Sequence, residues 1–439
     1  MKHFTIFVLI LSHSFISVSQ SIADFKSVKP LSKQPDTLVL PKTHTFQYLI
    51  KTDDDLMDGR KLGSTLDFTG YVPIDGSKEG WLSISSENEV AETAILKIKL
   101  DATKGKWEIL NSGKVDYYSP FVKDAIHTVS RFCSGTVTPW GTVIVAEEND
   151  KEGDGNKDGY HDVGWLIELN PYKWQIQTVD PQLRPQKLWA MGRFQHENVV
   201  ISSDNRTCYM GADSKKFGYV YKYVAKRPFN LAEGDLYVLC SEGKDVNASN
   251  AVWKKVPNNT TDERNNTNKL AEALGATHYA GVEDVEIGPD GLIYFACKYS
   301  GRIYRMKDLG EKAEVEVFVE SQKYDVLAED GKKYSADWHS GETGSDNLAF
   351  DGEGNLWVCN DGGNNAIWVV RKGHTLKKPK IELFAETPKG CEPTGITFSP
   401  DFKYLFLSLQ NPNSVGKQKD KFGKESVYDR SHTIVIERK

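Results

Sequence analysis

One local pattern recurs along this chain and constrains its fold more than any other feature. A cluster of turn-forming residues is followed at once by a short run of β-branched and aromatic residues, which is typical of two strands joined by a tight turn. The five copies are residues 138–141 before TVIVAEE, 203–206 before TCYMGAD, 288–291 before LIYFACK, 351–355 before LWVCND, and 399–403 before YLFLSLQ. A looser N-terminal counterpart lies at residues 75–85.

The spacing of these copies favours a β-propeller over a sandwich. With residues 140, 204, 290, 353 and 401 as markers of the turns, the intervals are 64, 86, 63 and 48 residues. Units of four short strands with loops of variable length are typical of propeller blades, and the chain has room for about six of them. We therefore predict an all-β, six-bladed propeller that residues 24–439 form as a single domain, because no Pro-, Gly- or Ser-rich linker divides them.

The longest interval contains a different pattern. A polar loop at residues 257–265 is followed by residues 266–278, NTNKLAEALGATH, which predict one short helix. We interpret this segment as a helical insertion into the propeller.

Residue types that commonly bind metals recur at a fixed distance before the turns. Counting seven residues back from the first four markers reaches Cys133, Glu197, Glu283 and Asp346. In the last copy Glu392 lies nine residues back, which is one strand period further and leaves the side chain on the same face. If the strand before each turn is the innermost strand of its blade, these residues converge on the central channel.

Convergence of this kind predicts a bound ion. Carboxylates that are packed together are costly to ionise, because burial and mutual repulsion both oppose the charge, and a multivalent cation removes that cost. The alternative is a set of solvated polar residues at the channel mouth, since acids also cap turns.

The donor types divide the predicted ligands into two kinds. A thiolate with carboxylates suits a transition metal, so Cys133 near Glu197 and Glu283 indicates iron or zinc. Carboxylate and amide oxygens alone suit calcium. The predicted ligands of this second kind are Glu147, Glu148, Asp346, Asn347 and Glu392.

The first residues predict export. A short basic start is followed by an apolar run at residues 4–16, far too short to span a membrane, and then by small residues that fit a cleavage site. We predict a signal peptide over residues 1–19, with cleavage as late as 23 as the alternative, and a periplasmic or secreted protein without an integral membrane span.

The net charge of −6 argues against nucleic acid as a partner. The six cysteines are widely spaced, so we expect most of them to be buried and reduced.

Several longer segments together resemble the PhoX-type alkaline phosphatases and their DUF839 relatives. They are collinear and cover most of residues 120–412, whereas the N-terminal hundred residues match loosely. The segments are CSGTVTPWGTVIVAEEN (133–149), GRFQHEN (192–198), GYVYKYV (218–224), GATHYAGVEDVEIGPDGLIYFA (275–296), DNLAFDGEGNLWVCNDG (346–362) and CEPTGITFSPDFKYLFLSLQNP (391–412). The resemblance implies a six-bladed propeller that hydrolyses phosphomonoesters with iron and calcium in its channel.

Carried over by position, the resemblance implies that Cys133, Glu197 and Glu283 are the iron ligands at the catalytic centre. It places the calcium ligands among the five residues that the donor types predict for calcium. One position departs from the family pattern: this chain has Gly281 where an arginine is expected to clamp phosphate, and glycine offers no charge in its place. We predict Arg193 as the substrate-binding residue instead, with Lys298 and Arg302 as the other candidates.

These observations favour an exported, metal-dependent phosphoesterase that acts as a monomer on a small phosphorylated substrate. A calcium-dependent sugar lactonase is one alternative, and it would have no use for Cys133. A non-catalytic, calcium-stabilised binding propeller is another, and Gly281 favours it.

Overall fold

The computed structural model describes residues 21–117, 126, 128–178, 186–242, 248–338, 344–362 and 365–439. Its regular structure is almost entirely antiparallel β, and four of the described sheets have four strands each. Three of these four sheets are β2 (Leu66–Asp75), β3 (Glu79–Ser86), β4 (Glu92–Asp101) and β5 (Lys106–Lys114); β6 (Phe132–Val137), β7 (Val143–Glu147), β8 (Leu166–Asn170) and β9 (Gln175–Ile176); and β21 (Ser345–Phe350), β22 (Leu356–Asn360), β23 (Ala366–Val370) and β24 (Ile381–Glu386). The fourth has the order β1 (His44–Lys51), β29 (His432–Arg438), β26 (Tyr404–Gln410) and β25 (Glu392–Phe398).

A larger sheet has nine strands. Its order is β10 (His196–Ile201), β11 (Thr207–Ala212), β12 (Val220–Arg227), β13 (Asn230–Ser241), β14 (Ala248–Val256), β18 (Lys312–Val319), β17 (Arg302–Asp308), β16 (Ile293–Cys297) and β15 (Val282–Ile287). Two separate hairpins are β19 (Lys323–Leu327) with β20 (Lys333–Asp337), and β27 (Lys417–Lys419) with β28 (Glu425–Val427). The described helical segments are η1 (Trp189–Met191), α1 (Thr261–Asn265), α2 (Thr267–Ala273) and η2 (Lys298–Ser300).

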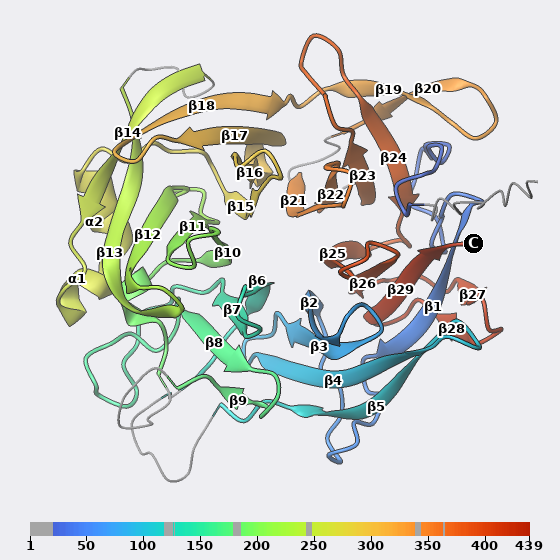
Figure 1. Ribbon diagram of the computed structural model, residues 1–439, viewed down its shortest axis with the longest axis horizontal. Coiled ribbons are helices and arrows are strands. Elements are labelled where there is room, and N and C mark those ends of the chain that lie inside the picture. Colours follow the sequence, from blue (N-terminus) through green and yellow to red (C-terminus); the bar gives the residue numbers. More distant parts are fainter. Residues whose placement is uncertain are drawn as a thin grey trace, which may run out of the picture.

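The sheets are arranged around a common centre like the blades of a propeller (Figure 1). The innermost strands are β2, β6, β10, β15, β21 and β25, and each contacts the next around the ring, with β25 contacting β2. Pairing of β1 with β29 closes the ring, because it adds an N-terminal strand to the sheet of C-terminal strands. The predicted all-β propeller arrangement is confirmed. The predicted number of six blades stays a prediction, because β14 pairs with β18 and joins two sets of strands in one sheet.

Each recurring turn-and-strand segment forms the hairpin between an innermost strand and its neighbour, so that β7, β11, β16, β22 and β26 follow the five turns. Gly141, Gly291 and Gly354 close three of these turns with φ angles of 80°, 76° and 82°. Glycine adopts such angles without steric cost. Asn205 and Phe402 close the other two with φ angles of 58° and 54°. The repeated sequence pattern therefore corresponds to one repeated backbone geometry.

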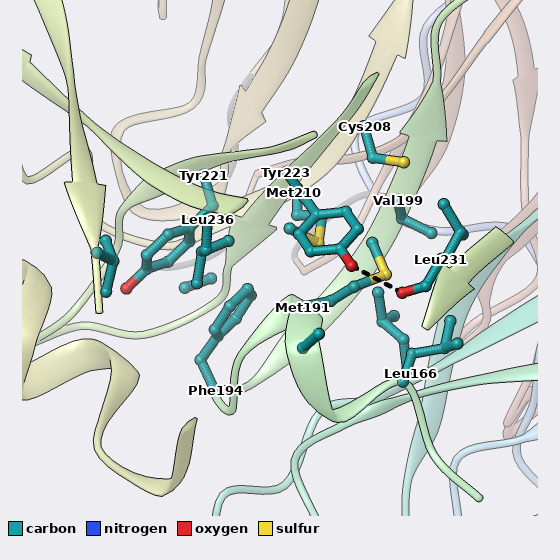
Figure 2. Close-up of a cluster of buried hydrophobic side chains, with 14 of the residues drawn as sticks. Leu166, Met191, Phe194, Val199, Cys208, Met210, Tyr221, Tyr223, Leu231 and Leu236 are labelled. Atoms are coloured by element: carbon teal, nitrogen blue, oxygen red, sulfur yellow. Dashed lines mark hydrogen bonds between the residues drawn. The ribbon is translucent and has the colours of Figure 1, made fainter. Parts of the chain in front are cut away.

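Apolar side chains fill the space between neighbouring sheets behind the innermost strands. Figure 2 shows the cluster between the sheet of β7 and β8 and the sheet of β10–β13, in which Phe194, Met210 and Tyr221 are buried. The ring of Phe194 stacks on that of Tyr221 with centroids 4.5 Å apart, and the hydroxyl of Tyr223 donates to the carbonyl of Leu231 at 2.8 Å. Burying one such side chain stabilises the fold by about 1.5–3 kcal/mol, so this cluster holds β10 against its neighbours.

The predicted helical insertion is present but differs in its bounds. The segment predicted as one helix over residues 266–278 contains α2, which ends at Ala273. The loop predicted before it contains the additional helix α1. Helix α1 begins there because Thr260 and Glu263 form a reciprocal capping box, a pattern that satisfies two backbone N–H groups at a helix start.

Three further sequence expectations concern the ends and the cysteines. The signal peptide predicted over residues 1–19 lies outside the described residues. Within the described ranges, none of the helices has the length and hydrophobicity needed to cross a membrane. The six cysteines are all free, and all except Cys133 are buried, as their wide spacing predicts.

Glu147 supports the fold and is not placed as a calcium ligand, which corrects the sequence prediction. Its carboxylate accepts hydrogen bonds from the ammonium of Lys187 at 2.7 and 2.8 Å and from the backbone N–H groups of Ser130, Gly164 and Trp165. Lys187 is also buried, and it donates to the carbonyl of Asp162 at 2.6 Å. The ion pair therefore fastens the end of β7 to the loop that leads into β8.

Replacing Lys187 by methionine is expected to destabilise the protein by about 3–5 kcal/mol, because it leaves the buried carboxylate of Glu147 without its counter-charge. The double variant Lys187→Met/Glu147→Gln removes both charges and should recover most of the loss. Urea unfolding followed by circular dichroism measures both effects. A single variant as stable as the wild type would contradict this assignment.

Candidate metal centre

Every innermost strand carries the same irregularity, at which its pairing with the following strand skips two residues. The skipped residues lie between Leu66 and Thr69, Phe132 and Gly135, His196 and Val199, Val282 and Val285, Ser345 and Leu348, and Thr394 and Thr397. A bulge of this kind bends a strand and re-aims its side chains. Because the innermost strands contact one another in a ring, the six bulges surround a common centre.

The first skipped residue carries a metal-binding side chain in five of these strands, namely Asp67, Cys133, Glu197, Glu283 and Asp346. These side chains belong to overlapping groups of three, within each of which one ligand atom per residue lies within 4.8 Å of the others. The groups are Asp67, Glu87 and Cys133; Cys133, Glu148 and Glu197; Glu197, Glu283 and Asp346; and Asp346, Asp361 and Glu392. The structure thus brings together the residues singled out by their register, although Cys133 and Glu283 are linked through Glu197 and share no group.

A second set of polar side chains stands directly after the second strand of the same hairpins. These residues are Glu87, Glu148, Asp213, Lys298 and Asp361. Three of them, the acids Glu87, Glu148 and Asp361, belong to the groups of possible ligands. Sequence reasoning named two residues of this set, Glu148 as a metal ligand and Lys298 as a basic candidate for substrate binding. It missed Glu87, Asp213 and Asp361, and it also missed Asp67. A signal for Asp213 and Asp361 was present, because the strand segments that end in GAD and CND stop on them, as VAEE stops on Glu148 and ACK on Lys298.

The second skipped residue at a bulge binds the neighbouring strand. The amide of Asn198 exchanges two hydrogen bonds with the backbone of Val285, at 2.9 and 3.1 Å. The amide oxygen of Asn347 accepts from the N–H of Gly395 at 2.8 Å, and its amide nitrogen donates to Asp346 at 3.1 Å. Asn347 therefore orients Asp346 and joins β21 to β25, and its role as a calcium ligand stays a prediction.

Glu197 is buried at the centre without a protein partner. Its side chain is fully buried, and among the described residues neither of its carboxylate oxygens has a hydrogen-bond partner. Glu283 is 1% exposed, and one of its oxygens lies 3.0 Å from the ammonium of Lys298. Burial raises the pKa of Glu197 well above its ordinary value, and the charges of Glu283 and Asp346 raise it further. The pKa values of Asp67, Glu148, Glu283, Asp346 and Glu392 are raised in the same direction, with burial as the largest cause. Unpartnered buried carboxylates are costly, and bound cations would satisfy them.

The donor set fits two kinds of metal ion. The thiol of Cys133 lies with Glu148 and Glu197, and a thiolate among carboxylates suits a transition metal such as iron. Burial raises the pKa of Cys133 well above its ordinary value, so a nearby cation would be needed to hold the thiolate. The group at the other end contains only carboxylates, Asp346, Asp361 and Glu392, and oxygen donors alone suit calcium.

Arg193 is placed outside this cluster, which corrects its prediction as the substrate-binding residue. Its guanidinium donates to the backbone carbonyls of Val163 at 2.8 Å, Lys151 at 2.7 Å and Asp150. The side chain is buried, so it holds the loop between β7 and β8. Arg302, another candidate, pairs with Glu320 at 2.6 Å.

Two other basic side chains flank the acids. The Nζ atom of Lys298 lies 3.0 Å from an oxygen of Glu283. An Nη atom of Arg131 lies 2.6 Å from Glu87 and 3.5 Å from Glu148. The cluster is therefore bordered by positive charge at two places, which is the arrangement that an anionic ligand of a metal centre requires.

Comparison with known proteins identifies the family. A family model described as "Alkaline phosphatase PhoX" matches residues 124–413, which is more than half of the chain. Among solved structures, the chain is similar to Pseudomonas fluorescens PhoX in complex with vanadate, a transition state analogue, with a TM-score of 0.70 and 20% identity over 94% of this chain and 98% of that one. This likeness shows the fold.

Two other solved structures are less similar. Virginiamycin B lyase from Staphylococcus aureus has a TM-score of 0.42 and 11% identity over 90% of this chain and 99% of that one. A gluconolactonase from Xanthomonas campestris has a TM-score of 0.36 and 10% identity over 94% and 99%. No curated protein matches the chain. The family match confirms the resemblance seen in the sequence: the chain belongs to the PhoX alkaline phosphatase family and is a phosphatase enzyme.

Proposed function

We propose that this protein is an exported, metal-dependent phosphomonoesterase whose active site is the cluster of acids around Cys133 and Glu197. The observation that carries the proposal is a cluster of buried acids, among which Glu197 has no protein partner, at the centre of a chain from a phosphatase family. Such carboxylates are costly unless they hold cations, and cations are well suited to bind the oxygens of a phosphoryl group.

The proposed metals are iron and calcium. Cys133, Glu197 and Glu283 would hold iron, with Glu148 beside the first two. Asp346, Asp361 and Glu392 would hold calcium, and Asp67 with Glu87 would complete the cluster next to Cys133. Bound there, the metals would neutralise phosphate oxygens and lower the pKa of water at the site.

Residues of the chain would hold the metal ligands in place and attract the substrate. The bulges place one donor from each of five innermost strands at the centre, and Asn347 holds Asp346 in position. Lys298 and Arg131, with side chains 17% and 39% exposed, reach the cluster from its rim and attract an anionic substrate. We propose no side-chain nucleophile, because the thiol of Cys133 would serve as a ligand of the iron.

The architecture extends the proposal to the whole chain. We propose that the nine-stranded sheet is two blades, β10–β13 and β15–β18, joined at their outer edges by β14, which makes six blades in one domain.

The buried positions of Ile22 and Ala23, and the hydrogen bond from His44 to the carbonyl of Ile22, support a signal peptide that ends at residue 19 over one that ends at 23. We propose that the mature protein acts in the periplasm or outside the cell.

The purified protein is expected to hydrolyse p-nitrophenyl phosphate when iron and calcium are supplied and to lose this activity in a chelator, because the acids would then hold no cations. Cys133→Ser should lose at least about tenfold in kcat, since a hydroxyl is a poorer ligand for iron. A calcium-dependent lactonase would tolerate this substitution. Melting that depends on metals, without turnover of any phosphate ester, would refute the phosphatase and favour a non-catalytic propeller.

Glu197→Gln is expected to lose bound metal, because Glu197 belongs to two of the ligand groups. A ligand at a hundred times its dissociation constant stabilises a protein by about 2.7 kcal/mol, so the wild type should melt higher with metals and the variant should gain less. Elemental analysis and thermal melting measure both effects. Glu425→Gln, at an exposed position on β28, removes the same charge and is the control. Equal metal content in all three proteins would contradict the site.

A further inference from the structure

One position in the cluster reverses the charge of its equivalents. The residues that directly follow the second strand of five inner hairpins are Glu87, Glu148, Asp213, Lys298 and Asp361. Four of them are acids, and the fifth is a lysine that begins η2 immediately after β16. An acid at this position adds to the attraction for cations, whereas a lysine attracts an anion to the same rim of the channel.

Lys298 lies among acids from three hairpins. Its Nζ atom is 3.0 Å from Glu283, 3.6 Å from Asp361 and 3.7 Å from Asp213. The side chain is 17% exposed, so the ammonium is not sealed from solvent. An ammonium has three N–H donors, and the distances to Asp361 and Asp213 are longer than a hydrogen bond. Lys298 therefore offsets the charge of the acids while it retains donors for a further ligand.

Gly281, where the family pattern has an arginine, has no room for a side chain. Its φ angle is 73°, a conformation that favours glycine, and an added Cβ would lie 2.6 Å from two ring carbons of Tyr299 and 2.8 Å from Asp213. Tyr299 directly follows Lys298, whose backbone N–H donates to the carbonyl of Gly281 at 2.9 Å. One short segment therefore closes position 281 and brings a different cation beside it.

We propose that Lys298 is the phosphate anchor of this site, with Nζ donating a hydrogen bond to a phosphoryl oxygen of the substrate at the Glu283 end of the cluster. The proposal rests on the phosphomonoesterase function proposed above. Lysine binds phosphate as a compact point charge. The ammonium of Lys298 stands within 4 Å of three carboxylates, where a further anion is tolerated only beside a positive charge. Arg131, at the Glu87 end of the cluster, is the competing candidate.

The test measures binding of inorganic phosphate to the metal-loaded protein by titration calorimetry, with metal content determined for each sample. Lys298→Met is expected to weaken phosphate binding by about 10- to 100-fold at unchanged metal content, which is the loss typical of one charge-assisted hydrogen bond. Lys298→Arg should stay within about tenfold of the wild type because it keeps the charge. Lys255→Met, which removes a lysine paired with Asp235 on the outer strand β14, is the control. For p-nitrophenyl phosphate, KM should rise in Lys298→Met by a larger factor than kcat falls.

The possible outcomes separate this inference from the function on which it rests. Phosphate binding that depends on Lys298, in a protein that hydrolyses no phosphomonoester, would support the anchor and refute the phosphatase. Turnover with equal phosphate affinity in the wild type and Lys298→Met would do the reverse. A greater loss of affinity in Arg131→Met than in Lys298→Met would overturn the inference. So would loss of metal from Lys298→Met that Lys298→Arg does not share, because the lysine would then serve the acids and not the substrate.

Discussion

The structure depends on how negative charge is compensated at its centre. Glu197 is fully buried, and neither of its carboxylate oxygens has a hydrogen bond among the described residues, whereas Glu283 has the ammonium of Lys298 3.0 Å from one oxygen. A folded protein tolerates such a group only if the acids stay protonated or a cation joins them. The apolar clusters between the sheets are therefore needed to stabilise the fold, because burying the acids at the centre of the ring costs free energy until they are neutralised.

The same bulge in every innermost strand explains how the acids come to face one another. In a regular strand, neighbouring side chains point to opposite faces, so only alternate residues would reach the channel. The bulge allows two consecutive residues to serve the centre. Glu283 joins the donor group, while the adjacent Asp284 accepts a hydrogen bond from the N–H of Leu348 on the next innermost strand at 2.8 Å. The proposed metal binding and the contacts that hold the ring together are thus assigned to neighbours in the sequence.

The repeated hairpins could be predicted because a turn that needs a positive φ angle leaves a local signature, as at Gly291 and Gly354. The register of Cys133, Glu197 and Glu283 followed from a constant distance to that turn. Asp67 escaped the same count because a second register shift between Pro73 and Asp75 alters the distance from the bulge to the turn of β2 and β3.

Other features depend on contacts that are distant in the sequence. Which of the adjacent acids Glu147 and Glu148 reaches the cluster is decided by Lys187, forty residues away, which pairs with Glu147. Arg193 was mistaken for a substrate ligand because the loop whose carbonyls it binds has no periodic pattern that would place it. The number of blades could be predicted only by dividing the length of the chain by the interval between the recurring turns. The spacing of the turns does not reveal that β14 pairs with β18.

The pairing of β1 with β29 has a consequence for biosynthesis. Donors in the cluster come from hairpins that begin with β2 and end with β25, and the sheet that completes the ring includes strands from both ends of the described chain. A chain whose last strands have not yet been synthesised cannot close the ring, so its donor side chains do not yet surround a common centre. Insertion of the proposed ions would therefore follow synthesis, and the compartment in which the ring closes would determine which metals are available to the site.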